Sequence, residues 1–387
     1  MTDKLNTILE AAHAHAKDVI LPNVDTWNAA KAWPRDASDQ AGAAGLTGLY
    51  APEDWGGQGL PLSEGIQVYE QLGLGDGAYA FALSMHNICT FAGCGYGTDA
   101  FKDTWARDLT SGRKLANFAL TEPQSGSDVA NSTMTATLDG DHYVLNGSKI
   151  WTTHAHHANW MFALVRTDRS GKPQTGITFL LIPMDTPGLR VDPIIFVSGE
   201  HEVNAVFFDD VRVPVSLRVG AENDGWTVAK YLLEFERGGQ HFTIDLKKQL
   251  RKLRRLIGSE ANAAAEDPTF VYRIAETEID VMALEQTELR IKGTVAAGEH
   301  PGALSSLVKV SGTELGQQCA ELLIEAAGQG AMPWQSEVLS PEYEGPTAAP
   351  EECVTTMAEY INSRSTTIYG GTAEIQRGII AKHVLGL

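Results

Sequence analysis

Two acidic residues in an otherwise apolar stretch are the best candidates for chemistry in this sequence. The segment YLLEFERGGQHF, residues 231–242, holds Glu234, Glu236 and Arg237 among apolar, aromatic and glycine residues. On an α-helix, residues three and four apart share a face, so Glu236 falls on the same stripe as the two leucines before it. Glu234 can pair with basic residues one turn away. Glu236 therefore either meets a cation from elsewhere in the fold or has a chemical role.

The amino-acid composition limits which classes of partner the chain can bind. Its 387 residues carry 49 acidic and 30 basic side chains, a formal charge of −19, which repels nucleic acid and anionic lipid. No apolar run approaches the length of a membrane span, and the first twenty residues lack the pattern of a signal peptide. We expect a cytoplasmic protein without nucleic-acid or membrane partners.

Metal ligands are the second kind of chemistry to consider. The tract HAHH, residues 154–157, could contribute imidazoles, but no second cluster with ligand spacing completes a site. The four cysteines form no CxxC pair and are expected to be reduced, structural thiols. We therefore expect no metal.

The elements that must position these residues follow an α, β, α order. Residues 1–115 have mainly helical periodicity, residues 116–219 alternate and carry turn signals, and residues 220–387 return to helical periodicity. This order predicts an α+β protein with an N-terminal helical domain, a middle barrel-like or sandwich-like β domain and a C-terminal four-helix bundle.

Local signals refine this outline. In the middle domain, Asp139-Gly140 and Asn146-Gly147 are both favoured pairs for hairpin turns. In the last domain, the pattern predicts long helices around 226–257, 268–298 and 303–327, and a final helix from about Thr372.

Four segments carry further information together. No G-x-G-x-x-G or P-loop motif is present, so a dinucleotide would be held in another way. The segments are FALTEPQSGSD (118–128), GSKIWTT (147–153), residues 231–242 and TIYGGTAEIQRGIIA (367–381). In this order and layout, the chain resembles the acyl-CoA dehydrogenase family of flavoproteins essentially from end to end.

The resemblance implies an FAD site between the β domain and the C-terminal helices. The residues at matching cofactor positions are Phe118, Leu120, Thr121, Ser127, Trp151, Thr153, Thr372 and Glu374. Trp151 would cover one face of the flavin, and Thr153 would place its hydroxyl near flavin N5. Ser127 would also lie at the mouth of the acyl-CoA tunnel.

The resemblance also locates the catalytic base. Many relatives carry it directly before the Gly-Thr of the last motif, where this chain has Gly370. A second group carries it on the first helix of the C-terminal domain, before an arginine, and Glu236 matches that position. Gly370 could still donate its backbone N–H to the thioester carbonyl. Glu234, Arg237 and Gly371 match substrate contacts.

Two departures from the family concern assembly. The Arg-x-x-Phe-Gly element that reaches the flavin of a neighbouring subunit is absent, and Ile324 stands where most members have glutamine. These departures resemble the larger subunits of heteromeric acyl-CoA dehydrogenases, in which a smaller subunit contributes the missing element. We expect a homodimer or homotetramer, with a heterotetramer as the alternative.

The sequence thus predicts α,β-dehydrogenation of an acyl-CoA to the trans-2-enoyl-CoA in fatty acid or lipid degradation, with electrons passing to an electron-transfer flavoprotein. An acyl-CoA oxidase-like flavoenzyme and a non-catalytic subunit of a heteromeric dehydrogenase are the alternatives. A flavin-bearing nucleic-acid binder conflicts with the charge of −19.

Overall fold

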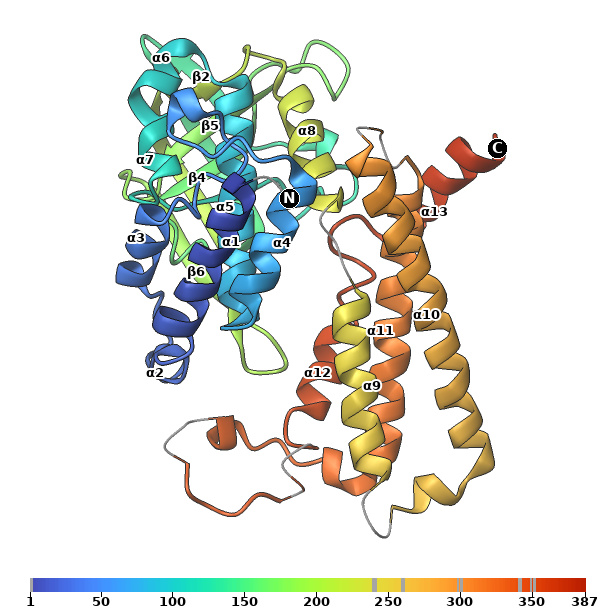
Figure 1. Ribbon diagram of the computed structural model, residues 1–387. Helices are drawn as coiled ribbons and strands as arrows, with labels where there is room; N and C mark the ends of the chain where they lie inside the picture. Colours follow the sequence, from blue (N-terminus) through green and yellow to red (C-terminus); the bar gives the residue numbers. More distant parts are fainter. Residues whose placement is uncertain are drawn as a thin grey trace. The chain divides into compact units, whose positions relative to one another are not determined.

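The structure is a computed structural model in which the chain divides into two compact units (Figure 1). It describes residues 3–238, 242–258, 262–297, 299, 302–339, 343–348, 350 and 353–387; the side chains of 233–238, 295–296, 336 and 339 lie outside the description. The first unit comprises Met1–Ile194 and His201–Glu236, and the second comprises Ile195–Glu200 and Arg237–Leu387. Each unit is described by itself.

Helices make up the N-terminal part of the first unit. They are α1 (Asp3–His15), α2 (Val24–Ala30), α3 (Arg35–Ala43), α4 (Leu62–Gly73), α5 (Gly77–Tyr96), α6 (Asp99–Phe101) and α7 (Arg107–Thr110). In α1 the buried Leu5, Ile8 and Ala12 form the apolar face that the periodicity predicts. Asp76 caps α5 by accepting a hydrogen bond from the Tyr79 backbone N–H at 2.7 Å.

The rest of the first unit is one eight-stranded sheet followed by most of α8 (Gly225–Gly238). The strands are β1 (Ala116–Ala119), β2 (Thr135–Asp139), β3 (His142–Thr153), β4 (Trp160–Arg166), β5 (Ile177–Pro183), β6 (Leu189–Ile195), β7 (His201–Pro214) and β8 (Arg218–Val219). Their order is β6-β7-β3-β2-β4-β5-β8, and β1 pairs in parallel with β4. The predicted α+β class is confirmed.

One of the two predicted hairpin turns is wrong. Gly140 lies in the turn that joins β2 to β3, with a positive φ of 63°, as expected. Asn146-Gly147 instead lies within β3, at a register shift against β7. A Cβ at position 147 would lie 2.9 Å from the Cα of Met134. The glycine therefore permits β3 to approach the residue that precedes β2, which is a tertiary requirement and not a turn signal.

A single apolar core joins the helices to the sheet in the first unit. All seven residues of β4 are buried, as expected for a strand covered on both faces. Helix α5 packs against β1, and Val228, Ala229 and Leu232 of α8 enter the same core.

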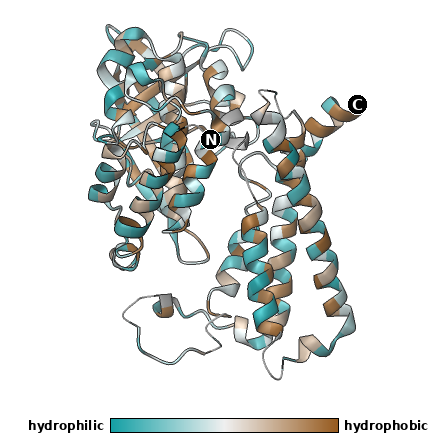
Figure 2. Cartoon of the chain, in the orientation of Figure 1, coloured by the Kyte–Doolittle hydropathy of each residue, from teal (hydrophilic) through white to brown (hydrophobic). Residues whose placement is uncertain are grey.

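The second unit is a helical bundle arranged around one central helix. Its helices are α9 (Thr243–Ile257), α10 (Pro268–Ala296), α11 (Leu304–Ala327), α12 (Thr356–Ser363) and α13 (Ala373–Ile380). Helix α11 contacts each of the other four (Figure 1). Figure 2 shows apolar and polar residues interleaved along these helices, as expected when one stripe of each faces a core. No helix in the described parts of the chain is apolar over the length that a membrane crossing needs.

The predicted helix over 226–257 is two helices, which corrects that expectation. Helix α8 ends at Gly238, the first of two consecutive glycines, and glycine disfavours a helix interior. At the start of α9, the buried carboxylate of Glu288 accepts hydrogen bonds from the backbone N–H groups of Phe242 at 2.9 Å and Thr243 at 3.3 Å. Its other oxygen accepts from the Thr243 hydroxyl. A side chain distant in sequence therefore caps the second helix.

Candidate active site

Six of the predicted cofactor residues lie in the first unit, on two segments that run side by side. The backbone N–H of Ile150 on β3 donates to the carbonyl of Thr121 at 3.0 Å. The side-chain amide of Asn117 on β1 donates to the carbonyl of Thr153 at 3.2 Å. These bonds bring the segments of Phe118, Leu120 and Thr121 against those of Trp151 and Thr153.

A buried ion pair fixes the two segments to each other. Lys149 Nζ on β3 lies 2.9 Å from Glu122 Oε1 and 3.1 Å from the carbonyl oxygen of Leu120. The side chains are 0% and 1% exposed. Glu122 also accepts from the backbone N–H groups of Thr133 at 2.6 Å and Met134 at 3.1 Å. Its charge is therefore fully compensated away from water.

The pKa values of the pair reflect this environment. Burial acts to raise the pKa of Glu122, but the charge of Lys149 and the backbone hydrogen bonds outweigh it and hold the pKa below its usual value. Burial lowers the pKa of Lys149, and the charge of Glu122 opposes that shift. The carboxylate is thus held in its charged form beside the ammonium group.

The loop after Glu122 presents Ser127 to solvent. Glu122 and Ser125 exchange backbone hydrogen bonds of 3.1 and 3.0 Å, and the Ser125 hydroxyl donates to the carbonyl of Asp128. Gly126 and Ser127 are exposed at the tip of this closed turn. Ser127 is therefore held in place by its neighbours, with its own hydroxyl available to a ligand.

Trp151 has a strained backbone and an exposed ring. Its φ is 60°, in the left-handed region that bulky residues rarely adopt, and it lies at a second irregularity between β3 and β7. The residue is 55% exposed. Strain of this kind is retained where the surrounding fold imposes it, and here it turns a large aromatic ring out of the sheet.

The described groups of the first unit fit a flavin. The hydroxyls of Thr121 and Thr153 have no hydrogen-bond partner within the described part of the chain, and both residues are half-buried. Beside them, the ring of Trp151 offers an uncovered aromatic face. A flat heteroaromatic ring with polar edges needs this combination of a stacking surface and free hydrogen-bonding groups.

The remaining predicted residues lie in the second unit, at the start of α13. Gly370 and Gly371 have consecutive positive φ values of 64° and 87°. Thr372 is the N-cap, and its hydroxyl accepts from the Ile375 N–H at 3.2 Å. Glu374 is exposed in the first turn, and its pKa is lowered chiefly by a backbone hydrogen bond. The turn exposes helix-start N–H groups that suit a polar ligand.

The predicted base falls outside what can be described at side-chain level. The backbone of α8 includes Glu234, Glu236 and Arg237, and their side chains lie outside the described residues. The role of Gly370 as a backbone donor likewise remains a prediction.

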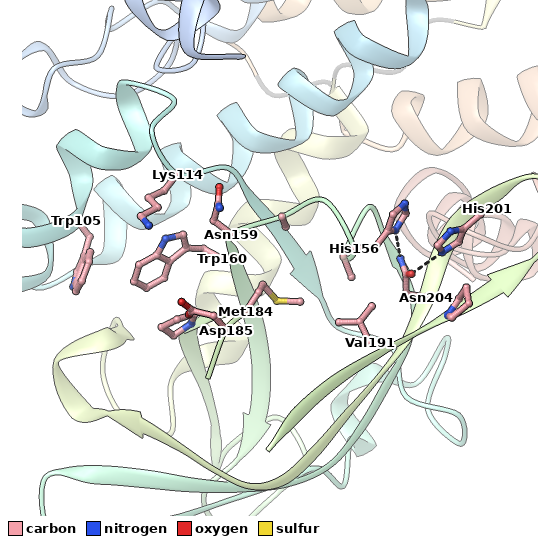
Figure 3. Close-up of a pocket in the computed structure, with 14 residues that line it drawn as sticks. Trp105, Lys114, His156, Asn159, Trp160, Met184, Asp185, Val191, His201 and Asn204 are labelled. Atoms are coloured by element: carbon pink, nitrogen blue, oxygen red, sulfur yellow. Dashed lines mark hydrogen bonds between the residues drawn. The ribbon is translucent and has the colours of Figure 1, made fainter. Parts of the chain in front are cut away.

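A hollow of about 780 Å³ opens in the first unit but contains none of the predicted site residues. Figure 3 shows His156, Asn204 and His201 joined by hydrogen bonds, together with Trp105 and Trp160 on the wall. The hollow borders the chain immediately after Thr153. Asp185 lines the hollow, but none of the residues predicted to bind FAD or substrate does, so we do not assign the predicted chemistry to it.

The sequence motifs at 118–128 and 147–153 contain Glu122 and Lys149, but the sequence alone did not identify either residue as important. A lysine inside a strand and a glutamate beside an apolar strand are the local signals that could have found them. Their pairing across 27 positions needs the fold.

Comparison with known proteins agrees with this arrangement. Models of the acyl-CoA dehydrogenase N-terminal, middle and C-terminal domains match residues 2–113, 117–211 and 223–385. Acyl-CoA dehydrogenase IpdE1 of Mycobacterium tuberculosis is 33% identical over 361 residues, 92% of this chain and 88% of the relative.

Two solved structures share the fold over the whole chain. The ChsE4-ChsE5 complex from Mycobacterium tuberculosis matches with a TM-score of 0.81 and 26% identity, covering 100% of this chain and 98% of that one. The FAD complex of PigA matches with a TM-score of 0.80 and 25% identity, again covering 100% and 98%.

Proposed function

Because this chain belongs to the acyl-CoA dehydrogenase family, FAD-dependent oxidoreductases that act on acyl-CoA, we propose that it dehydrogenates an acyl-CoA thioester between the α- and β-carbons. The product is the trans-2-enoyl-CoA, and an electron-transfer flavoprotein takes the electrons. Fatty acid or lipid degradation in the cytoplasm is the proposed setting.

The proposed FAD contacts are those that the sequence predicts. Phe118, Leu120, Thr121, Trp151 and Thr153 contact the ring system, supported by the buried Lys149–Glu122 pair. The remaining contacts come from Ser127, Thr372 and Glu374. When bound, FAD supplies the acceptor for the β-hydrogen, which leaves as hydride.

Glu236 is the proposed base that removes the α-proton. The observation that carries this assignment is the backbone at Gly370, which has no side chain and a φ of 64° that disfavours any other residue. Position 370, where many relatives carry the base, therefore has no titratable group in this chain. Along α8, Glu236 follows the buried Val228 and Leu232 at intervals of four, so it continues an apolar stripe. In this proposal, that position lets the carboxylate act as the general base.

The remaining roles concern the thioester. The N–H of Gly370 is the proposed donor to the carbonyl oxygen, where negative charge develops as the α-proton leaves. Glu234, Arg237, Gly371 and Ser127 are the proposed substrate contacts.

Self-association through the second unit is supported by an exposed apolar stripe on α10. Tyr272, Ile279, Met282 and Leu289 are between 52% and 64% exposed and recur at helical spacing. A dimer, alone or paired into a tetramer, would cover them. A heterotetramer is the alternative, since the related ChsE4-ChsE5 structure is named as a complex of two proteins.

The decisive experiment is anaerobic bleaching of the FAD-loaded protein by a panel of acyl-CoA thioesters. We expect at least one thioester to reduce the flavin rapidly. Glu236→Gln should retain FAD and thioester binding and slow reduction by roughly 10²- to 10⁴-fold. Glu276→Gln, an exposed carboxylate on α10, is the matched control and should reduce at the normal rate.

Three outcomes would redirect the proposal. Near-normal reduction by Glu236→Gln removes that residue from the role of base. Rapid reoxidation of the reduced protein in air favours the oxidase-like alternative. An absence of reduction by every thioester, together with low FAD occupancy when the chain is expressed alone, favours a non-catalytic subunit of a heteromer.

A further inference from the structure

Four histidines from two segments gather where β3 ends and β7 begins in the first unit. His154, His156 and His157 lie in the turn between β3 and β4, and His201 begins β7. The rings of His156 and His157 have centroids 3.9 Å apart, and the ring of His201 stacks on His156 at 3.9 Å. Sequence spacing alone could not bring His201 to this place.

The turn itself is built to group the imidazoles. The N–H of His154 donates to the carbonyl of Glu202 on β7 at 2.9 Å, which anchors the first histidine to the sheet. The N–H of His157 then donates back to the carbonyl of His154 at 2.9 Å, closing a tight turn. His154 has a φ of 54°, a left-handed backbone that histidine tolerates better than most residues. Strain of this kind is retained where the surrounding structure imposes it.

One nitrogen in the cluster lacks a partner. Nδ1 of His154 is buried and forms no hydrogen bond within the described part of the chain. A buried nitrogen without a hydrogen-bond partner carries a free-energy penalty in the folded protein. A bound ligand that accepts its lone pair would remove that penalty.

The donor set is suited to a borderline-soft divalent cation. His154, His156 and His157 each offer one ligand atom, and the three atoms lie within 4.8 Å of one another. Nitrogens bound tetrahedrally to Zn²⁺ at about 2.05 Å lie about 3.3 Å apart, so the ligand atoms must approach one another by up to about 1.5 Å to bind one ion. Neutral imidazoles favour Zn²⁺, Co²⁺, Ni²⁺ and Cu²⁺ over Mg²⁺ and Ca²⁺.

We propose that His154, His156 and His157 bind one transition-metal dication of the zinc class. The fourth coordination position is left for water or for a molecule from the hollow of about 780 Å³ that His156 lines. This proposal differs from the sequence-based expectation of no metal.

The surroundings of the cluster fit this site. The amide of Asn204 donates to the carbonyl of Thr152 at 3.0 Å and contacts His156 Nδ1 at 3.0 Å, while its oxygen contacts His201 Nε2 at 2.8 Å. An ion on His156 would replace one N–H of this amide, which keeps its other hydrogen bond. Asn204 would stay beside His156 through its hydrogen bonds to Thr152 and His201.

One neighbouring group should weaken metal binding at this site. The guanidinium of Arg35 donates to the carbonyl of His157 and to Asn159 Oδ1 at 2.6 Å, so a positive charge lies beside the site. That charge weakens cation binding relative to a site that includes a carboxylate. The competing interpretation is an aromatic cluster only, in which the ring of Trp33 packs 6.2 and 6.1 Å from those of His154 and His157.

The test uses the FAD-loaded protein, stripped of metal with a chelator and titrated with ZnCl₂ in a calorimeter. We expect one Zn²⁺ per chain, unaffected by excess Mg²⁺. His154→Gln, His156→Gln and His157→Gln should each weaken Zn²⁺ binding by roughly 100-fold or more. His142→Gln, a histidine on β3 that contacts Asp141, is the matched control and should bind as the parent does.

A second measurement is independent of flavin colour and of folding losses in any one variant. Substitution with Co²⁺ should give an EPR signal of a low-coordinate imidazole site, and Zn X-ray absorption should show three imidazole ligands. Absence of stoichiometric binding in the parent overturns the proposal. Binding that persists undiminished in two correctly folded histidine variants, judged by circular dichroism, also overturns it. Neither outcome depends on acyl-CoA turnover, so the proposed dehydrogenase function is tested separately.

Discussion

Lys149 and Glu122 form an ion pair of 2.9 Å from which solvent is excluded, and it joins β3 to the loop that carries Thr121 and Ser127. This buried contact thus helps to hold together two segments that are proposed to contact the cofactor. An intact buried ion pair adds little to the free energy of unfolding compared with two apolar residues in its place. Removal of one partner is costly, because the other charge is left buried and unpaired.

Removal of the lysine should destabilise the first unit strongly. We expect Lys149→Met to lower the free energy of unfolding by about 3–5 kcal/mol, because the Glu122 carboxylate is left buried without its cation. Urea denaturation measures the change, and FAD content should fall with it. Arg212→Met removes the exposed pair with Asp139 on the same sheet and should cost less than about 1 kcal/mol. Equal losses of stability in the two variants would contradict a stabilising role for the buried Lys149–Glu122 pair.

Acid should weaken the same contact. The pKa of Glu122 is held below its usual value, so its contribution to stability is present above the unfolded pKa of about 4.3 and is lost as pH falls through the folded value. We expect the stability difference between the parent and Glu122→Gln to shrink below about pH 4. Denaturation curves at a series of pH values measure it. A difference that is constant with pH would show that Glu122 is not held as a carboxylate.

Trp151 allows backbone strain to be separated from ring contact. Both Trp151→Ala and Trp151→Gly remove the ring, and both should diminish the visible circular dichroism of bound FAD. At a φ of 60° only glycine is unstrained, so Trp151→Gly should be more stable than Trp151→Ala by about 1 kcal/mol. Thermal denaturation of the apoproteins gives the comparison. Unchanged flavin spectra in both variants would exclude Trp151 from the cofactor site.

The glycine turn before α13 should be intolerant of a side chain. A Cβ at Gly371 would collide with the amide of Gln376, which is fully buried, and the φ of 87° adds strain. We expect Gly371→Ala to destabilise the second unit by about 2 kcal/mol. Gly378 lies in α13 with open space at its Cβ position, so Gly378→Ala should stabilise by about 0.5–1 kcal/mol. Changes of the same sign in both variants would refute this account.

Glu288 should be needed for α9 to begin where it does. Glu288→Ala leaves the Phe242 and Thr243 donors without their acceptor and should cost about 1–3 kcal/mol at neutral pH. Its neighbour Glu285, in an exposed pair with Lys247, is the control, and Glu285→Ala should cost less than about 1 kcal/mol. Urea denaturation by circular dichroism reports both. A loss of stability in Glu285→Ala but not in Glu288→Ala would contradict the role of Glu288 as the cap of α9.

Burial raises the pKa of Glu288, so the sign of its pH dependence is opposite to that of Glu122. Its contribution is present in full below the unfolded pKa of about 4.3 and declines as pH rises through the folded value. The loss caused by Glu288→Ala should therefore be larger at pH 4 than at pH 7. A loss that grows with pH would contradict the direction of the shift.

The sequence by itself determined the class of the fold, the order of helical and β segments and the short motifs that place the chain in its family. These follow from hydrophobic periodicity and from local residue types, which act over a few positions. The hairpin at Gly140 is one such local outcome, since a two-residue turn needs only its own backbone preferences.

Tertiary structure decided the features that join distant positions. The glycine at position 147 is needed because Met134 packs closely against it, and not because the chain turns there. The start of α9 depends on Glu288, which lies 45 positions away. The same holds for the contact of Lys149 with Glu122 and for His201 beside the HAHH turn. Burial and pairing across the chain are set by which surfaces the whole fold brings together, and no local pattern contains that information.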